Sequence, residues 1–305
     1  MDKEVLEKYK RAGSICAESR KLAERMFRPG LSLLELADAI EANIRELGGE
    51  PAFPVNISIN ELTAHYTPSA QDQRSVEAGD LVKIDVGAHV DGYIGDMAFT
   101  LCSEPNNPLV KGAEKCLEAG IKAVEPGVTV AEISHVISDT AENAGLGVIV
   151  NLTGHTLDKY VFHGSPSIPN IKNNSTHQFK EGDVIALEPF VTDKNSIVKE
   201  SGPTEIYSYA QDRPVRLAEA REILAIARDE YHKLPFAKRW LLKKFSPIKV
   251  ALALRQLEQA YAIQPYPTLR EADGRPVAQA EHTIIVAKKP VVTTRQETAE
   301  KKGKK

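Results

Sequence analysis

Four carboxylates and one histidine stand in or beside apolar, strand-like runs of this 305-residue sequence. They are Asp85, Asp96, His155, Glu188 and Glu281. Three of the acids interrupt or adjoin the apolar runs themselves. A buried charge is strongly unfavourable unless it is paired or binds a metal ion. The pattern therefore predicts that separate strands converge on metal ions, although each acid taken alone could also be a strand-end residue that faces solvent.

Carboxylate oxygens and one imidazole suit the divalent ions Mn, Fe, Co or Zn. Four carboxylates carry too much negative charge for one such ion, so two divalent metal ions are predicted. A two-metal site can hold a bridging hydroxide and polarise a carbonyl group. The reaction class that this chemistry indicates is hydrolysis.

Two further histidines, His65 and His163, lie in loop-like segments that contain proline or glycine. Close to a metal, such an imidazole could donate a hydrogen bond to a substrate carbonyl or to a leaving amine. A surface or internally bonded histidine is the alternative interpretation. His282 directly follows Glu281, so on a strand its side chain points to the opposite face, and it is not counted as a ligand.

Hydrophobic periodicity predicts a mixed α/β (α+β) chain. We expect helices over 3–27, 32–48, 106–124 and 129–144, irregular to extended chain over 51–67, a loop-rich stretch over 156–180, and strands over 81–90, 93–102, 147–151, 183–192, 197–208, 276–287 and 290–294. Ser32 and Thr129 each precede a glutamate by three residues, which is the pattern of a helix-capping box. The turn around Asp91-Gly92 predicts a hairpin that brings Asp85 and Asp96 within reach of one ion or of two adjacent ions.

Residues 215–262 have an almost wholly helical period, broken near 234–235 and 246–247, and read as a small insertion. We expect a catalytic domain formed by 1–207 and 268–305, and a helical insertion subdomain over 208–267. Helices followed by a hairpin, and then helices followed by strands, also suggest two similar α+β halves that face each other.

The formal net charge of −3 indicates no general attraction to DNA, and the sequence contains no run of about 18 apolar residues that would span a membrane. The charged N-terminus does not resemble a signal peptide, and three widely spaced cysteines suggest reduced thiols. We therefore expect a cytoplasmic protein without a DNA or membrane partner. The lysine-rich stretch 301–305 is predicted to be a solvated, disordered end, with a weak role in attracting RNA or the ribosome as an alternative.

The order of the five ligand candidates resembles that of the methionine aminopeptidases. The surrounding stretches KIDVG (83–87), IALEPF (185–190) and EHTI (281–284) are similar as well, and AHYTP (64–68) resembles the catalytic-histidine loop of that family. The resemblance extends over about 3–294. The long interval between Glu188 and Glu281, which contains the helical insertion, resembles type 2 enzymes, and the short N-terminal part resembles their archaeal form.

This resemblance implies a pita-bread fold, in which two pseudo-symmetric halves surround a curved antiparallel sheet. It also implies a methionyl aminopeptidase that removes the initiator methionine from nascent proteins with a small second residue, through attack of a dinuclear metal-bound hydroxide on the first peptide bond. The partners implied are nascent polypeptide N-termini, with the ribosome as a candidate, and the protein is expected to be a monomer.

The resemblance also implies the role of each site residue. Asp85 should chelate one metal, Asp96 and Glu281 should bridge both, and His155 and Glu188 should complete the other. Glu188 should also carry protons, His65 should contact the scissile amide, and His163 should hold the peptide carbonyl or oxyanion. Phe53 and Phe162 should form the walls of the methionine pocket. One departure is Ala280, which stands where the family usually has an aromatic residue. Side chains alternate along a strand, so we expect position 280 to alter packing rather than chemistry.

Two alternatives remain open at this point. A prolidase-like or aminopeptidase P-like hydrolase shares this core but normally carries a further N-terminal domain, and here the core helices are expected to begin near residue 3. A non-catalytic binding protein of the same fold would have lost metal ligands, whereas this chain keeps the whole set.

Overall fold

The computed structural model describes residues 1–295, so the predicted lysine-rich end at 301–305 lies outside the described residues. The helices are α1 (Lys3–Met26), α2 (Leu33–Glu46), α3 (Pro108–Ala123), α4 (Val130–Asn143), α5 (Ala218–Ala225), the π-helical turn η1 (Ile226–Glu230), α6 (Lys238–Leu241) and α7 (Pro247–Gln259). The strands are β1 (Glu50–Pro51), β2 (Asn56–Ile59), β3 (Leu62–Ala64), β4 (Val82–Val90), β5 (Tyr93–Leu101), β6 (Gly147–Val148), β7 (Thr153–Asp158), β8 (Val161–Pro169), β9 (Val184–Leu187), β10 (Phe190–Thr192), β11 (Val198–Tyr209), β12 (Phe236–Ala237), β13 (Ile263–Glu271), β14 (Ala278–Gln279), β15 (His282–Ile285) and β16 (Val291–Val292).

The helices begin near the residues that the sequence marks as caps. Thr129 and Glu132 form a complete capping box at the start of α4, because the Thr129 side chain accepts from the Glu132 N–H and the Glu132 side chain accepts in return. At α2 the Ser32 hydroxyl accepts a hydrogen bond from the Glu35 N–H at 3.4 Å, so this cap is confirmed as one half of the box. These caps satisfy N–H groups that a helix start otherwise leaves unpaired.

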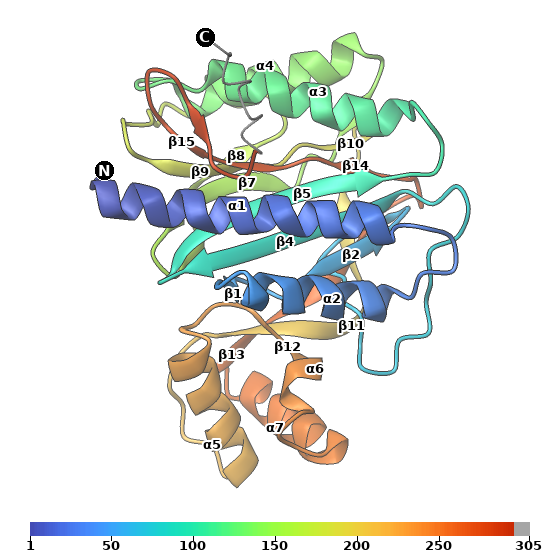
Figure 1. Ribbon diagram of the computed structural model, residues 1–305, viewed down its shortest axis with the longest axis vertical. Coiled ribbons are helices and arrows are strands. Elements are labelled where there is room, and N and C mark those ends of the chain that lie inside the picture. The colour runs from blue at the N-terminus through green and yellow to red at the C-terminus, as the bar shows by residue number, and fades with distance from the viewer. Residues whose placement is uncertain (296–305) are drawn as a thin grey trace, which may run out of the picture.

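Helices cover the outside of the curved antiparallel sheets, whose concave side holds the site. Helix α1 crosses β4 and β5, while α3 and α4 lie side by side over β10, β14 and β6 (Figure 1). Each half has its own apolar core: Leu36, Ile40 and Ile84 belong to the first, and Ile133 and Ile185 belong to the second. Burial of apolar side chains between helices and sheets in each half is the main favourable term that holds the layers together.

The hairpin formed by β4 and β5 carries the first two ligand candidates, as predicted. Asp91 and Gly92 form its two-residue turn with φ values of 52° and 90°, which suit Asp and Gly. Asp85 pairs with Ala98, and Ala98 lies two residues from Asp96, so both carboxylates project from the same face of the sheet. The register therefore places the two acids diagonally on one face.

Strand predictions were wrong in three places. The stretch 156–180, expected to be loop-rich, contains β8 and the end of β7, because the glycine and prolines of β8 conceal a strand that pairs with β7 through register shifts. Strand β13 was missed, since its prolines resemble strand breakers. The predicted strands 183–192 and 276–287 are each interrupted, at Glu188 and at Ala280-Glu281, where the Glu281 N–H leaves its own ladder and bonds to the Ala98 carbonyl at 2.8 Å.

Side chains fasten the last strands to the first hairpin. The Thr100 hydroxyl donates to the Gln279 carbonyl at 2.8 Å and accepts from the Gln279 N–H at 2.9 Å. The Thr283 hydroxyl makes the same double contact with the backbone of Asp96, at 2.9 and 2.7 Å. These buried pairs fix how β14 and β15 lie against β5, and with them the relative positions of Asp96 and the segment that carries Glu281.

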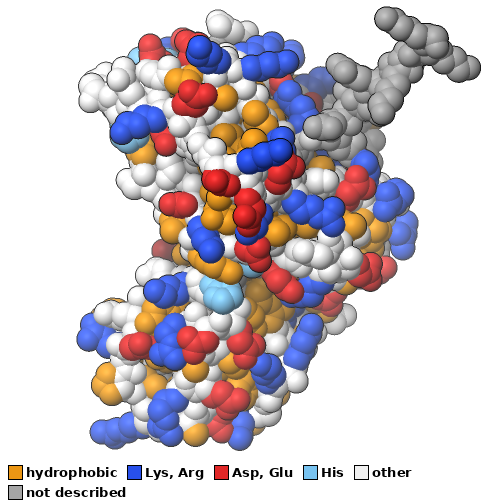
Figure 2. Space-filling view, turned by 60° about the vertical axis from the view of Figure 1, so that its left-hand side comes forward, with side chains coloured by type: hydrophobic (Ala, Val, Ile, Leu, Met, Phe, Trp, Pro, Cys, Tyr) orange, Lys and Arg blue, Asp and Glu red, His pale blue; other side chains and the backbone are white. Residues whose placement is uncertain are grey.

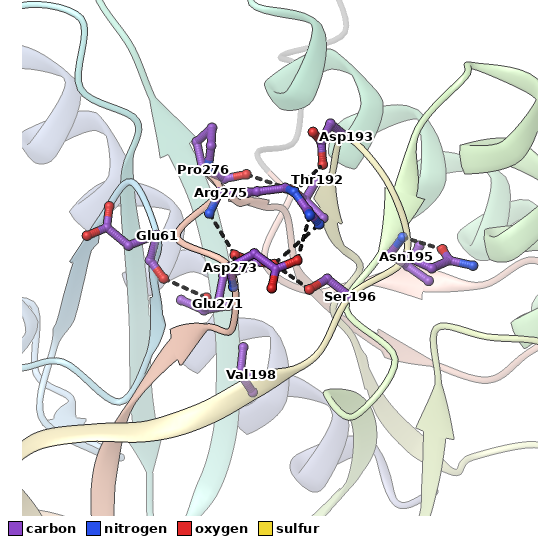
Figure 3. A network of polar contacts seen from close by, with 12 residues as sticks. Glu61, Thr192, Asp193, Asn195, Ser196, Val198, Glu271, Asp273, Arg275 and Pro276 are labelled. Carbon is purple, nitrogen blue, oxygen red and sulfur yellow. Dashed lines mark hydrogen bonds and ion pairs between the residues drawn. The ribbon is translucent and has the colours of Figure 1, made fainter.

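A buried glutamate holds the turn that leads into β14 (Figure 3). Glu271 is 1% exposed and accepts hydrogen bonds from the Ser196 hydroxyl and from the backbone N–H groups of Asp273 and Arg275, at 2.8 and 2.6 Å for the latter two. Arg275 in turn bonds to Asp273 and reaches Asp193 at 3.4 Å. These bonds fix the conformation of the turn between β13 and β14, a few residues before Glu281.

The segment that contains α5, η1, α6 and α7 has a separate apolar core with Trp240 and Leu254 among its members. It projects from the lower end of the molecule in Figure 1, and Figure 2 shows the surface narrowing above it. On the face in Figure 2 basic and acidic side chains are interspersed. None of the helices within residues 1–295 has the length and apolar run needed to cross a membrane.

Candidate metal centre

One cavity of about 290 Å³ receives the five predicted metal ligands from five places in the chain. Asp85 comes from β4, Asp96 from β5, His155 from β7, Glu188 from the break between β9 and β10, and Glu281 from the residue before β15. Because strands from both halves meet here, residues up to 196 positions apart in the sequence share one cavity. The structure thus brings the whole predicted set together.

The donor atoms lie close enough to share ions. Ligand atoms of Asp96, His155 and Glu281 are all within 4.8 Å of one another. The His155 Nε2 atom lies 3.7 Å from Asp96 Oδ2 and 3.6 Å from Glu188 Oε1. Such separations between donor atoms are typical of groups that coordinate a common cation.

Burial and mutual repulsion raise the pKa values of the acids. Burial raises the pKa of Asp85 to about 7. Burial, followed by repulsion from the Asp85 carboxylate, raises the pKa values of Asp96 and Glu188 well above the usual range. For Glu281 the causes are burial and then Asp96. Cations at the centre would remove this repulsion, so the electrostatics favour metal binding coupled to proton release.

The buried polar atoms of the site suit the binding of metal ions. Among the described residues, Asp85 Oδ1 and both Asp96 carboxylate oxygens are buried without a hydrogen-bond partner. A buried acceptor that lacks a donor is costly, and a bound cation would satisfy it. Burial lowers the pKa of His155 to about 4, so its imidazole is neutral at pH 7, as a metal ligand must be.

Metal removal should make the protein sensitive to pH. Folded-state pKa values raised above the unfolded values stabilise the protonated protein, so stability is present at low pH and is lost as the pH rises through about 7, the pKa of Asp85. We expect the Tm of chelator-treated protein to fall by roughly 5 °C or more between pH 5.5 and pH 7.5. Protein with added Mn²⁺ should show a much smaller fall. Calorimetric scans in matched buffers check this, and equal pH dependence with and without metal would contradict it.

Polar side chains that the sequence analysis did not single out support the ligands. The Gln279 amide nitrogen lies 3.5 Å from Glu188 Oε2. Asn56 lies opposite Asp85 in the β2–β4 register and lines the cavity. Gln279 stands two residues before Glu281, so strand alternation was a usable signal for it. No sequence pattern singled out Asn56, because its strand is short and the local sequence does not predict the pairing of that strand with β4.

His65 and His163 line the same cavity as the four acids and the His155 imidazole. His65 adopts the left-handed backbone conformation with φ of 59°, unusual for a residue with a side chain, and its Nδ1 atom is buried without a partner among the described residues. Burial lowers the pKa of His65 to about 4 and that of His163 well below its usual range. Both rings are therefore neutral at pH 7, so each can donate one N–H while its other nitrogen accepts.

The two phenylalanines predicted for the methionine pocket lie against each other, with ring centroids 4.5 Å apart. Phe162 lines the cavity, and its ring is 5.3 Å from that of His155. Phe53 is buried behind Phe162 and is not among the lining residues. Ala280 is buried in the apolar core of the second half and is not among the residues that line the cavity. That location agrees with an effect on packing.

Comparisons with known proteins agree with this site. The model of metallopeptidase family M24 matches residues 7–223. The chain is 44% identical over 286 residues to the methionine aminopeptidase of Methanothermobacter thermautotrophicus, covering 92% of this chain and 96% of the relative. Among solved structures it resembles a thermophilic Arx1 (TM-score 0.83, 17% identity, 98% and 93% of the two chains) and the methionine aminopeptidase of Rickettsia prowazekii (TM-score 0.70, 22% identity, 97% and 98%). At those identities the structures show a shared pita-bread fold. By its sequence and its fold, the chain belongs to the methionine aminopeptidases of metallopeptidase family M24.

Proposed function

We propose that this protein is a metal-dependent aminopeptidase that removes the initiator methionine from nascent polypeptides with a small second residue. One observation carries the proposal: five metal-ligand side chains and two neutral histidines line a single cavity. The identity to curated methionine aminopeptidases over nearly the whole chain supports the choice of reaction.

The donor set favours two divalent ions, with Co, Mn, Fe or Zn as candidates. Asp85 would hold one ion, Asp96 and Glu281 would bridge both, and His155 and Glu188 would complete the other. When bound, the ions would polarise the scissile carbonyl and lower the pKa of a water molecule. Four carboxylates against two dications leave the centre close to neutral, so the ions would offset the mutual repulsion that raises the pKa values of Asp96 and Glu281.

Protein side chains would move protons and hold the substrate around this centre. Glu188 can take a proton from the attacking water and pass it to the leaving amine, because burial and its acidic neighbours raise its pKa above the usual range. A neutral His163 can donate its N–H to the carbonyl oxygen as negative charge develops there. His65, which lines the same cavity, would contact the scissile amide and help to expel the new amine.

The methionine side chain would lie against Phe162, with Phe53 forming the layer behind it. A cavity of about 290 Å³ stands near the lower end of the range for small-ligand sites, roughly 300 Å³. Aromatic rings also contact a thioether sulfur favourably. We propose that the same confinement restricts the second residue of the substrate to small side chains.

The remaining proposals concern organisation and setting. We propose that 208–267 is a helical subdomain inserted in a catalytic domain formed by 1–207 and 268–305, because α5, α6 and α7 enclose their own core. The expected setting is the cytoplasm, where nascent N-termini emerge, with the ribosome as a candidate partner and a monomeric enzyme.

A panel of three peptides separates this function from its nearest alternative, an Xaa-Pro dipeptidase. Protein supplied with Mn²⁺ should release methionine from Met-Ala-Ser and hydrolyse Met-Leu-Ser at least about 100-fold more slowly, since the larger second side chain does not fit. The dipeptide Ala-Pro should remain intact. Amino-acid release measured by chromatography decides between them, and preferential cleavage of Ala-Pro would favour the dipeptidase.

A further inference from the structure

The described residues that line the cavity lie outside 208–267, yet α6 of the helical segment is connected to the stretches that carry two of them, Asn56 and His65, through bonds described below. Arg239, in α6, is 6% exposed, and Glu41, in α2, is 3% exposed. Their side chains form a buried ion pair, with Arg239 Nη2 donating to Glu41 Oε1. Further hydrogen bonds to such a pair help to offset the cost of removing its two charges from water.

Groups from elsewhere in the chain bond to most polar atoms of the pair. Arg239 Nε makes no hydrogen bond among the described residues and lies 3.6 Å from Asp38 Oδ1. The indole N–H of Trp240 donates to Glu41 Oε2 at 2.7 Å, and the backbone N–H of Val55 donates to Glu41 Oε1 at 3.3 Å. Burial raises the pKa of Glu41, while the Arg239 guanidinium opposes that rise. Because Val55 immediately precedes Asn56, which lines the cavity, the pair is tied to one wall of the site.

The second terminal nitrogen of the Arg239 guanidinium, Nη1, contacts the loop that carries His65. Arg239 Nη1 donates to the Thr67 hydroxyl at 2.6 Å and to the Pro68 carbonyl at 3.3 Å. The Thr67 hydroxyl in turn donates a hydrogen bond to the Val55 carbonyl at 2.8 Å. Thr67 is 1% exposed, so water does not compete for these bonds.

This anchoring bears on His65 because its backbone is held in a disfavoured conformation. A left-handed φ of 59° costs free energy in a residue with a side chain and persists only where neighbouring contacts hold the chain in place. Before His65, Ala64 pairs with Leu269 of β13. After it, the Tyr66 carbonyl accepts a hydrogen bond from the Ile57 N–H at 2.7 Å, and Arg239 contacts the next two residues.

We propose that Arg239 is a positioning residue for the reaction: its planar fork links Glu41 to Thr67 and thereby holds the His65 loop in its catalytic conformation. The inference rests on the proposed role of His65. The helical segment would then contribute to the reaction, because α6 supplies the guanidinium group that positions the His65 loop. A displacement of about 1 Å in a positioned group can cost roughly 100-fold in rate.

A double-mutant cycle with His65 distinguishes positioning from general structural damage. Arg239→Gln should lower kcat on Met-Ala-Ser by roughly 10- to 100-fold while KM changes by less than about threefold, because the His65 contact forms during the reaction. In a His65→Ala background, the same change should lower kcat by less than about threefold. Equal losses in both backgrounds would overturn the proposal.

Two further variants guard against a misfolded protein. Thr67→Val removes the hydroxyl that Arg239 contacts but leaves the Glu41–Arg239 pair intact, and it should reproduce the coupling to His65 with a smaller loss. Arg228→Gln, in the same helical segment, removes exposed ion pairs with Asp212 and Asp229 and should leave kcat unchanged. A matching loss in Arg228→Gln would also contradict the proposal.

Hydrogen exchange supplies a readout that does not depend on activity. In Arg239→Gln and Thr67→Val, amides 62–68 should exchange faster, while those of β5 should keep their protection. Unchanged exchange over 62–68 in both variants would overturn the proposal even if activity falls. If the wild-type protein releases no methionine, the proposed function fails, and the exchange result alone then decides whether Arg239 holds this loop.

Discussion

Replacing Glu188 with glutamine is expected to lower kcat for methionine release by about 10³-fold while the fold is retained. General acid–base groups contribute roughly 10²- to 10⁴-fold. The amide keeps the shape of the side chain but cannot accept and return a proton, and it is also a weaker metal ligand. Steady-state kinetics with Met-Ala-Ser at saturating Mn²⁺ measure the loss, and circular dichroism checks the fold.

The matched control for this variant is Glu181→Gln, in the exposed turn before β9. It removes one carboxylate from the same part of the chain but from a solvated position, so kcat should stay within a factor of two. Near-normal turnover in Glu188→Gln would remove Glu188 from its role as proton carrier. Equal losses in both variants would show that the effect is not specific to the cavity.

Asp96→Asn is expected to abolish the metal centre. Both carboxylate oxygens of Asp96 are buried without a hydrogen-bond partner among the described residues, and the side chain lies 3.7 Å from His155. Loss of a group that merely supports a ligand typically costs 10- to 100-fold in metal affinity, so loss of a bridging ligand should exceed roughly 100-fold. We expect at most one Mn²⁺ per chain by equilibrium dialysis and methionine release near background.

Asp91→Asn is the control, because Asp91 is an exposed residue of the same hairpin, paired with Lys8 at the surface. Asparagine also tolerates the left-handed conformation of that turn position. This variant should bind two Mn²⁺ and keep its activity. An Asp96→Asn protein that still binds two ions would contradict the bridging role.

The site was more predictable from the sequence than the strands that carry it. An acid in an apolar run is an energetic anomaly that can be read locally, so Asp85, Glu188 and Glu281 could be found one by one. The hairpin between β4 and β5 was equally clear, because its turn residues and its alternation agree. The same anomaly predicted that the strands converge on metal ions, and the resemblance to the methionine aminopeptidases then supplied the role expected of each residue.

The parts that escaped prediction depend on distant pairing. Strand β13 contains prolines and forms a strand only because β11 and β3 lie on either side of it. The strands are interrupted at Glu188 and Glu281, where the backbone leaves the strand pairing and the carboxylate lines the cavity. The contact of Arg239 with Thr67 spans 172 positions, and no local pattern announces a partner at that distance.

The most direct test of the central claim is to follow methionine release from Met-Ala-Ser as metal is restored to stripped protein. The account predicts no release without metal, and turnover that rises as Mn²⁺, Co²⁺, Fe²⁺ or Zn²⁺ occupies up to two sites per chain. Absence of release with every metal, despite two bound ions, would contradict the assignment of substrate. Absence of both binding and release would contradict the metal centre itself and favour a binding protein that shares the fold.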